Sequence, residues 1–487
     1  MRNFIRGSAV LFCLSLTSCA SWSSTLSKNK IQKKIDLNET IDRALENPEF
    51  CKGYWPAENW WEMFEDKQLA CLIETGLDSN PSLMVTESRV KQANQEAFVT
   101  RAKLLPQIQG FFNYLYLYLS QKGIVRQLRG VNPNVHLFAL MFDFTYEFDF
   151  WRKNMNAYKA AIGLAKTQEA INQQTKMILS VSIAKQYYNL QANFSRLAIL
   201  QELLENKTRL FQLIELRRVN RIETLMSVND IKQEILSLQE AIAGLSGEIQ
   251  LQQSTLLTLM GKNPGEKIKV TACWDLPDRP FELPDQIGLN LLTRRPDLIA
   301  RVWRVYSMTK QVGVSVAQFF PDVNFFGLGG SDGVKFSDLF SSNSGTTTLL
   351  PYLVQPVFMG GKLRANLKAK LAEFEEAVHD YNHQLLAAAN EVVSEITKIR
   401  SVQEKLTYQC EQVHSKQENY HLVYSRYQSG IDSMMKVLSS DYLFLKSRFH
   451  QIDLESERVQ ATIALVQALG GGYHFQTTEN TKEIEKL

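Results

Sequence analysis

Two histidines and several glycines stand at spacings that could serve metal or phosphate chemistry. His379 and His383 are four residues apart, with Asp380 beside the first, so both imidazoles would share one face of a helix. A zinc peptidase built on this spacing also needs a glutamate beside its first histidine and a third ligand. The chain supplies neither, so the pattern favours a solvated helix face over a metal site.

The glycine patterns are also incomplete. Gly360–Lys362 lacks the earlier glycine and the following serine or threonine of a phosphate loop, and Asp332 replaces the third glycine of a dinucleotide loop over Gly327–Gly330. No serine or cysteine lies in a recognisable nucleophile motif. With 54 basic against 51 acidic residues, the charge balance does not indicate nucleic acid. We therefore expect no enzyme, no cofactor, no metal and no nucleic-acid partner.

The N-terminus carries the residues for one covalent modification. Two arginines precede an apolar stretch over residues 9–16, which is shorter than the roughly 20 residues that a membrane-spanning helix needs. Leu16–Cys19 then resembles a bacterial lipobox, where the chain is cut before a cysteine that receives acyl chains. We expect residues 1–18 to be a signal peptide and Cys19 to be lipidated. An ordinary secretory signal with a stray Cys13 or Cys19 is the alternative.

Beyond this anchor, the chain consists of two similar halves. Asn80–Leu83 recurs 215 positions later as Arg295–Leu298, and beyond the next prolines the offset becomes 209. A coiled seam requires an apolar residue at every seventh position in a held phase. The first half contains such a row, and the second half repeats it: Ile183, Leu190, Leu197, Leu204 and Phe211, then Val392, Ile399, Leu406, Val413 and Tyr420. The shared phase indicates that both halves follow one plan.

The same rows predict very long helices. The stretch from Trp151 to Val219 would extend on the order of 100 Å at about 1.5 Å per residue, far beyond a globular helix. Turns are expected near residues 220–223 and 429–432. A second pair of rows, Val228–Leu256 and Leu438–Val466, lies one position out of step, so it supports coiling more than duplication. A filament or spacer coiled coil would show the same periodicity. The segments between the helices are therefore needed to distinguish this alternative.

Those segments alternate as strands do. Period-two patterns predict strands at residues 111–119, 138–150, 322–328 and 347–358, with a Gly/Ser-rich loop from Gly329 to Gly345. In the second segment one face is aromatic or aliphatic, and the other is polar: Asp143, Thr145, Glu147 and Asp149. We expect the acidic side chains among these, Asp143, Glu147 and Asp149, to line a lumen and the aromatic face to meet lipid. Packing of that face on the protein's own core is the soluble alternative.

Four strands are too few to close a barrel. Single-chain outer-membrane barrels begin at about eight strands, and open edges in lipid would leave backbone groups without partners. Closure therefore requires several copies of the chain, and three copies would supply twelve strands. The strand pattern predicts an oligomer.

In their order, these motifs resemble the TolC-like outer membrane factors, in particular the lipoprotein branch of multidrug efflux and secretion channels. The resemblance covers almost the whole mature chain. In the first half it rests on Trp60, Trp61, Phe64, Leu69, Asn80, Pro81, Leu83, Ala102, Leu105, Pro106, Tyr146, Glu147, Asp149 and Trp151. In the second half it rests on Arg294–Asp297, Phe320, Pro321, Pro356, Gly360–Leu363, Tyr381, Glu391, Tyr427, Gly430, Leu438 and Gly470–Gly472.

The resemblance implies a mainly helical fold with some β structure. Three chains would form a trimeric 12-strand β-barrel, continued by a 12-helix α-barrel tunnel with a mixed α/β belt. Such a protein is a passive exit duct in the outer membrane, joined by a periplasmic adaptor to an inner-membrane pump of the RND or ABC class. Ala20 and Ser21 follow Cys19 in place of the aspartate that often retains lipoproteins in the inner membrane. A type I protein secretion duct of the same fold and a non-pore coiled-coil scaffold stay open as alternatives.

The resemblance also places a gate at the helix turns, where this chain departs from the family pattern. Arg221 stands at the position equivalent to Gly430, and Ser439 stands where the family often carries an aspartate. Asp432 and Lys436 are nearby. These four residues are the candidate periplasmic gate, and solvated charges at a helix turn are the alternative.

The sequence predicts an organisation in six parts. They are the signal peptide 1–18, a lipid-anchored segment and equatorial region 19–79, a first repeat 80–261, a linker 262–294, a second repeat 295–472 and a polar tail 473–487. Cys51 and Cys71 could pair in an oxidising periplasm, although the sequence does not give their geometry.

Overall fold

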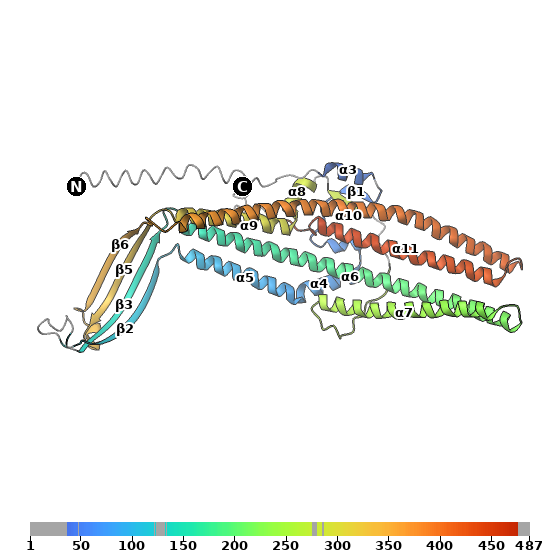
Figure 1. Cartoon of the computed structure of the whole chain (residues 1–487), viewed down its shortest axis with the longest axis horizontal. Helices are drawn as coiled ribbons and strands as arrows, with labels where there is room; N and C mark the ends of the chain where they lie inside the picture. The colour runs from blue at the N-terminus through green and yellow to red at the C-terminus, as the bar shows by residue number, and fades with distance from the viewer. Residues whose placement is uncertain are drawn as a thin grey trace.

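The computed structural model describes residues 37–46, 48–120, 122, 132, 134–274, 280–284 and 287–475. The molecule is elongated, with a four-stranded sheet at one end and the turns of the long helices at the other (Figure 1). The predicted signal peptide, Cys19 and most of the predicted tail lie outside the described residues. Among the helices within those ranges, none has an apolar segment sufficient to cross a membrane.

The two halves contain corresponding elements in the same order. The first half comprises α4 (Lys67–Ser79), α5 (Pro81–Ala102), β2 (Gln107–Tyr118), β3 (Asn134–Phe148), α6 (Lys153–Val219) and α7 (Leu225–Leu259). The second comprises α8 (Ile287–Arg294), α9 (Pro296–Ala317), β5 (Asp322–Gly333), η4 (Phe336–Phe340), β6 (Gly345–Val354), α10 (Lys362–Gln428) and α11 (Met434–Ala468). A smaller region consists of α3 (Asn38–Leu45), β1 (Phe50–Gly53) and η2 (Trp60–Phe64), which precede the first half, and β4 (Phe281–Pro284), which lies between the halves in the chain.

The predicted long helices are confirmed, and corresponding helices in the two halves have the same length. Helices α6 and α10 each have 67 residues, and α7 and α11 each have 35. Helix α6 begins at Lys153, two residues after the predicted start. The backbone N–H groups of Asn154 and Met155 donate to the Asp149 carboxylate, at 3.0 and 2.7 Å, and so supply the first turn with its partners.

The sheet has the antiparallel order β2-β3-β5-β6. The loop predicted from Gly329 to Gly345 is wrong at its start, because β5 continues to Gly333 and η4 follows it. Glycine at 330 permits this pairing: a Cβ there would lie 2.2 Å from the Leu140 carbonyl oxygen. The other predicted strand bounds differ by smaller margins, and β6 ends at Val354 instead of residue 358.

The main core lies at the level of the small β1–β4 sheet, midway along the helices (Figure 1). The Phe64 ring lies 5.1 Å from that of Tyr188, and Trp60 and Phe64 line a cavity with Ile399 of α10 and Val459 of α11. Segments far apart in the sequence therefore meet in one equatorial core. Cys51 and Cys71, considered above for a disulfide, are both free thiols.

Candidate channel surface and gate

The two helix turns at the far end of the molecule share one backbone design. In the first turn the Ile222 N–H donates to the Arg217 carbonyl, and in the second the Ile431 N–H donates to the Arg426 carbonyl, both at 2.9 Å. These bonds close the helix with one residue in the left-handed region. That residue is Gly430 in the second turn, with φ of 71°, and Arg221 in the first, with φ of 63°. A side chain in this conformation costs roughly 1–2 kcal/mol relative to glycine.

The second turn also contains a charge cluster. The Asp432 carboxylate accepts from Arg426 Nε at 2.7 Å and from Lys436 Nζ at 3.0 Å. Hydrogen bonds from these two cations lower the pKa of Asp432, so its carboxylate stays ionised. The first turn repeats the arrangement more loosely, with Arg217 Nε 3.4 Å from Glu223 Oε1.

The structure therefore brings together two of the four predicted gate residues. Asp432 and Lys436 form an ion pair, whereas Arg221 is exposed on the other turn and forms no ion pair with a described residue. Ser439 is exposed on α11. Sequence reasoning missed Arg426, which binds Asp432. The signal for it was available, because Arg426 and Asp432 stand 209 positions after Arg217 and Glu223.

The three acidic residues predicted on the lumen face of the second strand have different environments. Asp143 lies in β3 opposite Leu328, and one of its carboxylate oxygens is buried without a hydrogen-bond partner in the described structure. Glu147 lies near the end of β3 and pairs with Lys153 at 2.6 Å. Asp149 lies beyond the strand, which ends at Phe148, and accepts from the first N–H groups of α6.

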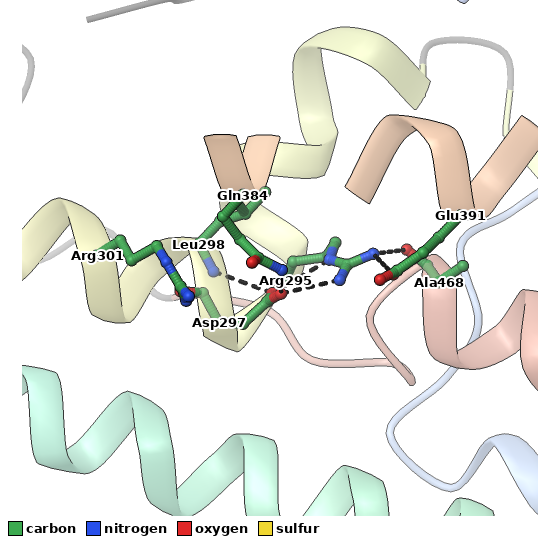
Figure 2. A network of polar contacts seen from close by, with 7 residues as sticks. All are labelled: Arg295, Asp297, Leu298, Arg301, Gln384, Glu391 and Ala468. Atoms are coloured by element: carbon green, nitrogen blue, oxygen red, sulfur yellow. Dashed lines mark hydrogen bonds and ion pairs between the residues drawn. The ribbon is translucent and has the colours of Figure 1, made fainter. Parts of the chain in front are cut away.

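A buried polar network fixes the start of the second repeat (Figure 2). The Arg295 guanidinium donates to Asp297 through Nε at 3.1 Å and Nη2 at 2.8 Å, and its Nη1 donates to Glu391 Oε2 at 2.7 Å. The same Nη1 donates to the Ala468 carbonyl at 3.0 Å. Gln384 adds a 2.8 Å bond to Asp297. One side chain thus connects α9, α10 and the end of α11.

This network has a counterpart in the first half. The Asn80 Nδ2 donates to the Leu259 carbonyl at 2.7 Å, and Leu259 stands 209 positions before Ala468. The following glycines also correspond. A Cβ at Gly261 would lie 2.4 Å from the Ser79 carbonyl oxygen, and one at Gly470 would lie 2.0 Å from that of Arg294. Each pair of long helices therefore ends against the helix that opens its own repeat.

A known protein family matches both halves of this duplicated architecture. The family model for outer membrane efflux proteins matches residues 72–262 and 289–471. The chain belongs to the outer membrane efflux protein family. The resemblance to TolC-like outer membrane factors is thereby confirmed. The protein is a subunit of an outer-membrane efflux channel, and it is not an enzyme.

Individual relatives of the family agree over most of the chain. The multidrug resistance outer membrane protein MdtQ of Escherichia coli O6:H1 is 27% identical, with 89% of this chain and 91% of the relative covered. MdtP of Shigella flexneri is 26% identical, with 86% and 87% covered. The outer membrane protein VceC of Vibrio cholerae has a TM-score of 0.75 at 28% identity, with 86% of this chain and 100% of VceC covered. The CmeC channel of Campylobacter jejuni shows the same fold, with a TM-score of 0.81 at 18% identity over 89% and 92% of the two chains.

Proposed function

We propose that three copies of the chain form one channel, with a single 12-strand β-barrel that continues as a tunnel of twelve long helices. The observation that carries this proposal is a helix face that is covered in one half of the chain and uncovered in the other. Because α6 and α10 are repeats of each other, the partners of α6 indicate what α10 lacks.

Helix α6 packs against α9, the opening helix of the other repeat, through a row of four positions. The Ser307 hydroxyl of α9 donates to the Ala160 carbonyl at 2.9 Å, and a Cβ at Gly163 would lie 3.0 Å from the Ser307 Cβ. The row on α6 consists of Asn156, Ala160, Gly163 and Thr167, and its counterpart on α10 consists of Ala365, Ala369, Ala372 and Glu376. All four counterparts on α10 are exposed.

A second copy of the chain offers the matching surface. The counterpart of α9 in the first half is α5, whose side chain Phe98 is 56% exposed and stands at the position of Gly313. In the covered interface, Asn156 fills the space above Gly313. In the proposed interface, Phe98 of one copy would fill the space above Ala365 of the next, so the large and small residues exchange sides. This complementarity supports α5 of a second copy as the partner of α10.

The open edges of the sheet also indicate that several copies of the chain assemble. Strands β2 and β6 are the outer strands of the four-stranded order, so each has one edge without a partner strand among the described residues. Pairing of β6 with β2 of the next copy would satisfy both edges, as closure in lipid requires. Three copies would then give the twelve strands expected from the sequence.

In this assembly the chain serves as the exit duct of a tripartite system. We infer a periplasmic adaptor at the helix turns and an inner-membrane RND or ABC pump as the energy source, with lipidated Cys19 as a membrane anchor. The names of MdtQ and MdtP support multidrug efflux as the role. The gate would lie at the turns, around Asp432 and Lys436. The predicted domain bounds, 80–261 and 295–472 for the repeats, belong to the same proposal.

Cysteine cross-linking tests the interface. The positions that correspond to Gly163 and Ser307 across two copies are Ala372 and Gln92, and their Cβ separation should approach the 3.5–4.5 Å of a disulfide. We expect Ala372→Cys with Gln92→Cys to link copies covalently in a chain whose other described cysteines are serine. The matched control is Ala372→Cys with Glu96→Cys, about one helical turn away, which should link poorly.

Light scattering and planar-bilayer conductance complete the test. A detergent-solubilised monomer without conductance would refute the channel assembly. A conducting trimer that links through Glu96 instead of Gln92 would refute only the proposed register.

A further inference from the structure

The two junctions between the sheet and the long helices differ sharply, although they are repeats of each other. In the first junction, Lys153 at the start of α6 binds Glu147 at 2.6 Å and Asp322 at 2.7 Å. The Trp151 ring stacks on Phe320 with centroids 4.6 Å apart, and its Nε1 donates to the Pro321 carbonyl at 2.9 Å. The Lys153 ammonium and the Trp151 ring therefore both have their partners within the chain.

The second junction has lost these partners. Lys362 stands in the place of Lys153, but Pro356 replaces Glu147 and Phe358 replaces Asp149. In the proposed trimer, the residue in the place of Asp322 would be Gln107 of the neighbouring copy, which has no charge. The cation has therefore been kept while the carboxylates around it have been removed.

Apolar side chains and unpaired cations consequently lie together at this junction. Val357 and Phe358 are 91% and 87% exposed, among the most exposed large apolar residues of the described chain. Directly after them, Lys362, Arg364 and Lys368 are exposed and form no ion pair with any described residue. Basic residues in the first turns of a helix oppose its dipole, so the helix itself gains nothing from them.

At the end of its α5, the neighbouring copy would add further positive charge. Its α5 ends at Ala102, next to the junction in the proposed assembly, and Arg101 and Lys103 there are exposed without an ion pair to a described residue. A protein partner at this place would have to supply several carboxylates and an apolar pocket. A phospholipid leaflet supplies phosphates beside acyl chains, at the level where the strands end.

We propose that this second junction, defined by Val357, Phe358, Lys362, Arg364 and Lys368, binds anionic phospholipids of the leaflet that faces the periplasm. The apolar pair enters the acyl region, and the three cations bind headgroup phosphates. This inference rests on the proposed channel, because the strands must be in a membrane for the junction to reach its surface. It adds a lipid preference that the channel alone does not require.

Spin-labelled lipids provide the test. The full-length channel is reconstituted into phosphatidylcholine bilayers, and electron paramagnetic resonance measures the association of labelled phosphatidylglycerol and labelled phosphatidylcholine with the protein surface. The variant Lys362→Gln/Arg364→Gln/Lys368→Gln removes the cations of the junction. The matched control, Lys262→Gln/Lys267→Gln/Lys269→Gln, removes three exposed cations from the equatorial loop.

We expect the junction variant to lower the preference for phosphatidylglycerol at least about fivefold, the effect of one cation near a lipid surface. The equatorial control should keep the preference, and so should Lys362→Arg/Arg364→Lys/Lys368→Arg. High salt should weaken the preference of the unmodified channel. An unchanged preference in a junction variant that still forms conducting trimers would overturn the inference and leave the channel proposal intact. Failure of the unmodified chain to insert and conduct would instead refute the channel proposal.

Discussion

Replacement of Arg295 by alanine tests whether the buried network holds the helices of the second repeat together. The Arg295 and Asp297 side chains are 6% and 4% exposed, so their ion pair is shielded from water. The substitution would leave the Asp297 carboxylate buried with only Gln384 and one backbone N–H as partners. It would also remove the bond to the Ala468 carbonyl that connects α9 with the end of α11.

The expected cost is about 3–5 kcal/mol, the range for breaking a buried ion pair by removing one partner. Burial alone raises the pKa of Asp297, but the hydrogen bond and charge of Arg295 outweigh it, and the pKa is lowered. A lowered carboxyl pKa stabilises the fold above the unfolded value of about 3.9 and loses that contribution as pH falls through the folded value. We therefore expect the pair to stabilise the native chain down to about pH 4. In the variant, burial acts on Asp297 with less opposition, so acid sensitivity should begin at higher pH.

Denaturant unfolding of the solubilised chain, followed by far-ultraviolet circular dichroism, measures the effect. Arg209→Ala is the matched control, because its pair with Glu205 is exposed and should contribute no more than about 0.5 kcal/mol. The double variant Arg295→Met/Asp297→Leu removes both buried charges and should recover part of the loss. The stabilising role of the buried ion pair is refuted if Arg295→Ala costs no more than Arg209→Ala, or if the double variant is as unstable as the sum of its single substitutions.

Three further predictions address the turns and the sheet. Arg221→Gly should stabilise the first helix turn by about 1 kcal/mol, because Arg221 is a non-glycine residue in the left-handed backbone region. Gly430→Arg should destabilise the second turn by a similar amount. Hydrogen exchange of the turn amides measures both effects, and unchanged exchange would show that the conformation is unstrained. Lys436→Glu should alter conductance and ion preference in planar bilayers, and unchanged values would mean that the entrance has been misplaced. Gly330→Ala should destabilise the sheet by about 1–3 kcal/mol, since its Cβ would lie 2.2 Å from the Leu140 carbonyl oxygen, whereas Gly329→Ala meets nothing within 4 Å. Equal unfolding midpoints for these two glycine variants would contradict that contact.

The helices were predictable because their signal is local and repeated many times. An apolar residue at every seventh position from Ile183 to Phe211 predicted a long helix, and its expected start near Trp151 lies two residues from the observed start at Lys153. The two-residue difference came from Asp149, which was assigned to the strand but binds the first N–H groups of the helix. Side-chain capping depends on a rotamer and a chain direction, which alternation of residue types does not encode.

Strand bounds and the candidate gate were less predictable, because both depend on distant residues. The glycines at 329 and 330 indicate a loop by composition, yet they lie in β5 because β3 approaches closely there. At the gate, the sequence analysis identified Asp432 and Lys436 but missed Arg426, although the 209-position offset relates Arg426 and Asp432 to Arg217 and Glu223; the turn brings the Arg426 guanidinium to Asp432. Turn geometry places residues that lie six positions apart in contact, which no helical spacing predicts.

The sequence by itself determined the duplication, the long coiled helices, the amphipathic strands and the family, because each is a periodic or ordered pattern within the chain. Tertiary structure decided how the helices of the second repeat join. Arg295 reaches Glu391 and Ala468, which are 96 and 173 positions away, and no periodic signal connects residues at such separations. It also decided which faces stay open, because α6 is covered by α9 while the same face of α10 is not. Repeated sequences specify equivalent helices, but the place of each repeat in the chain determines which of them finds a partner within it.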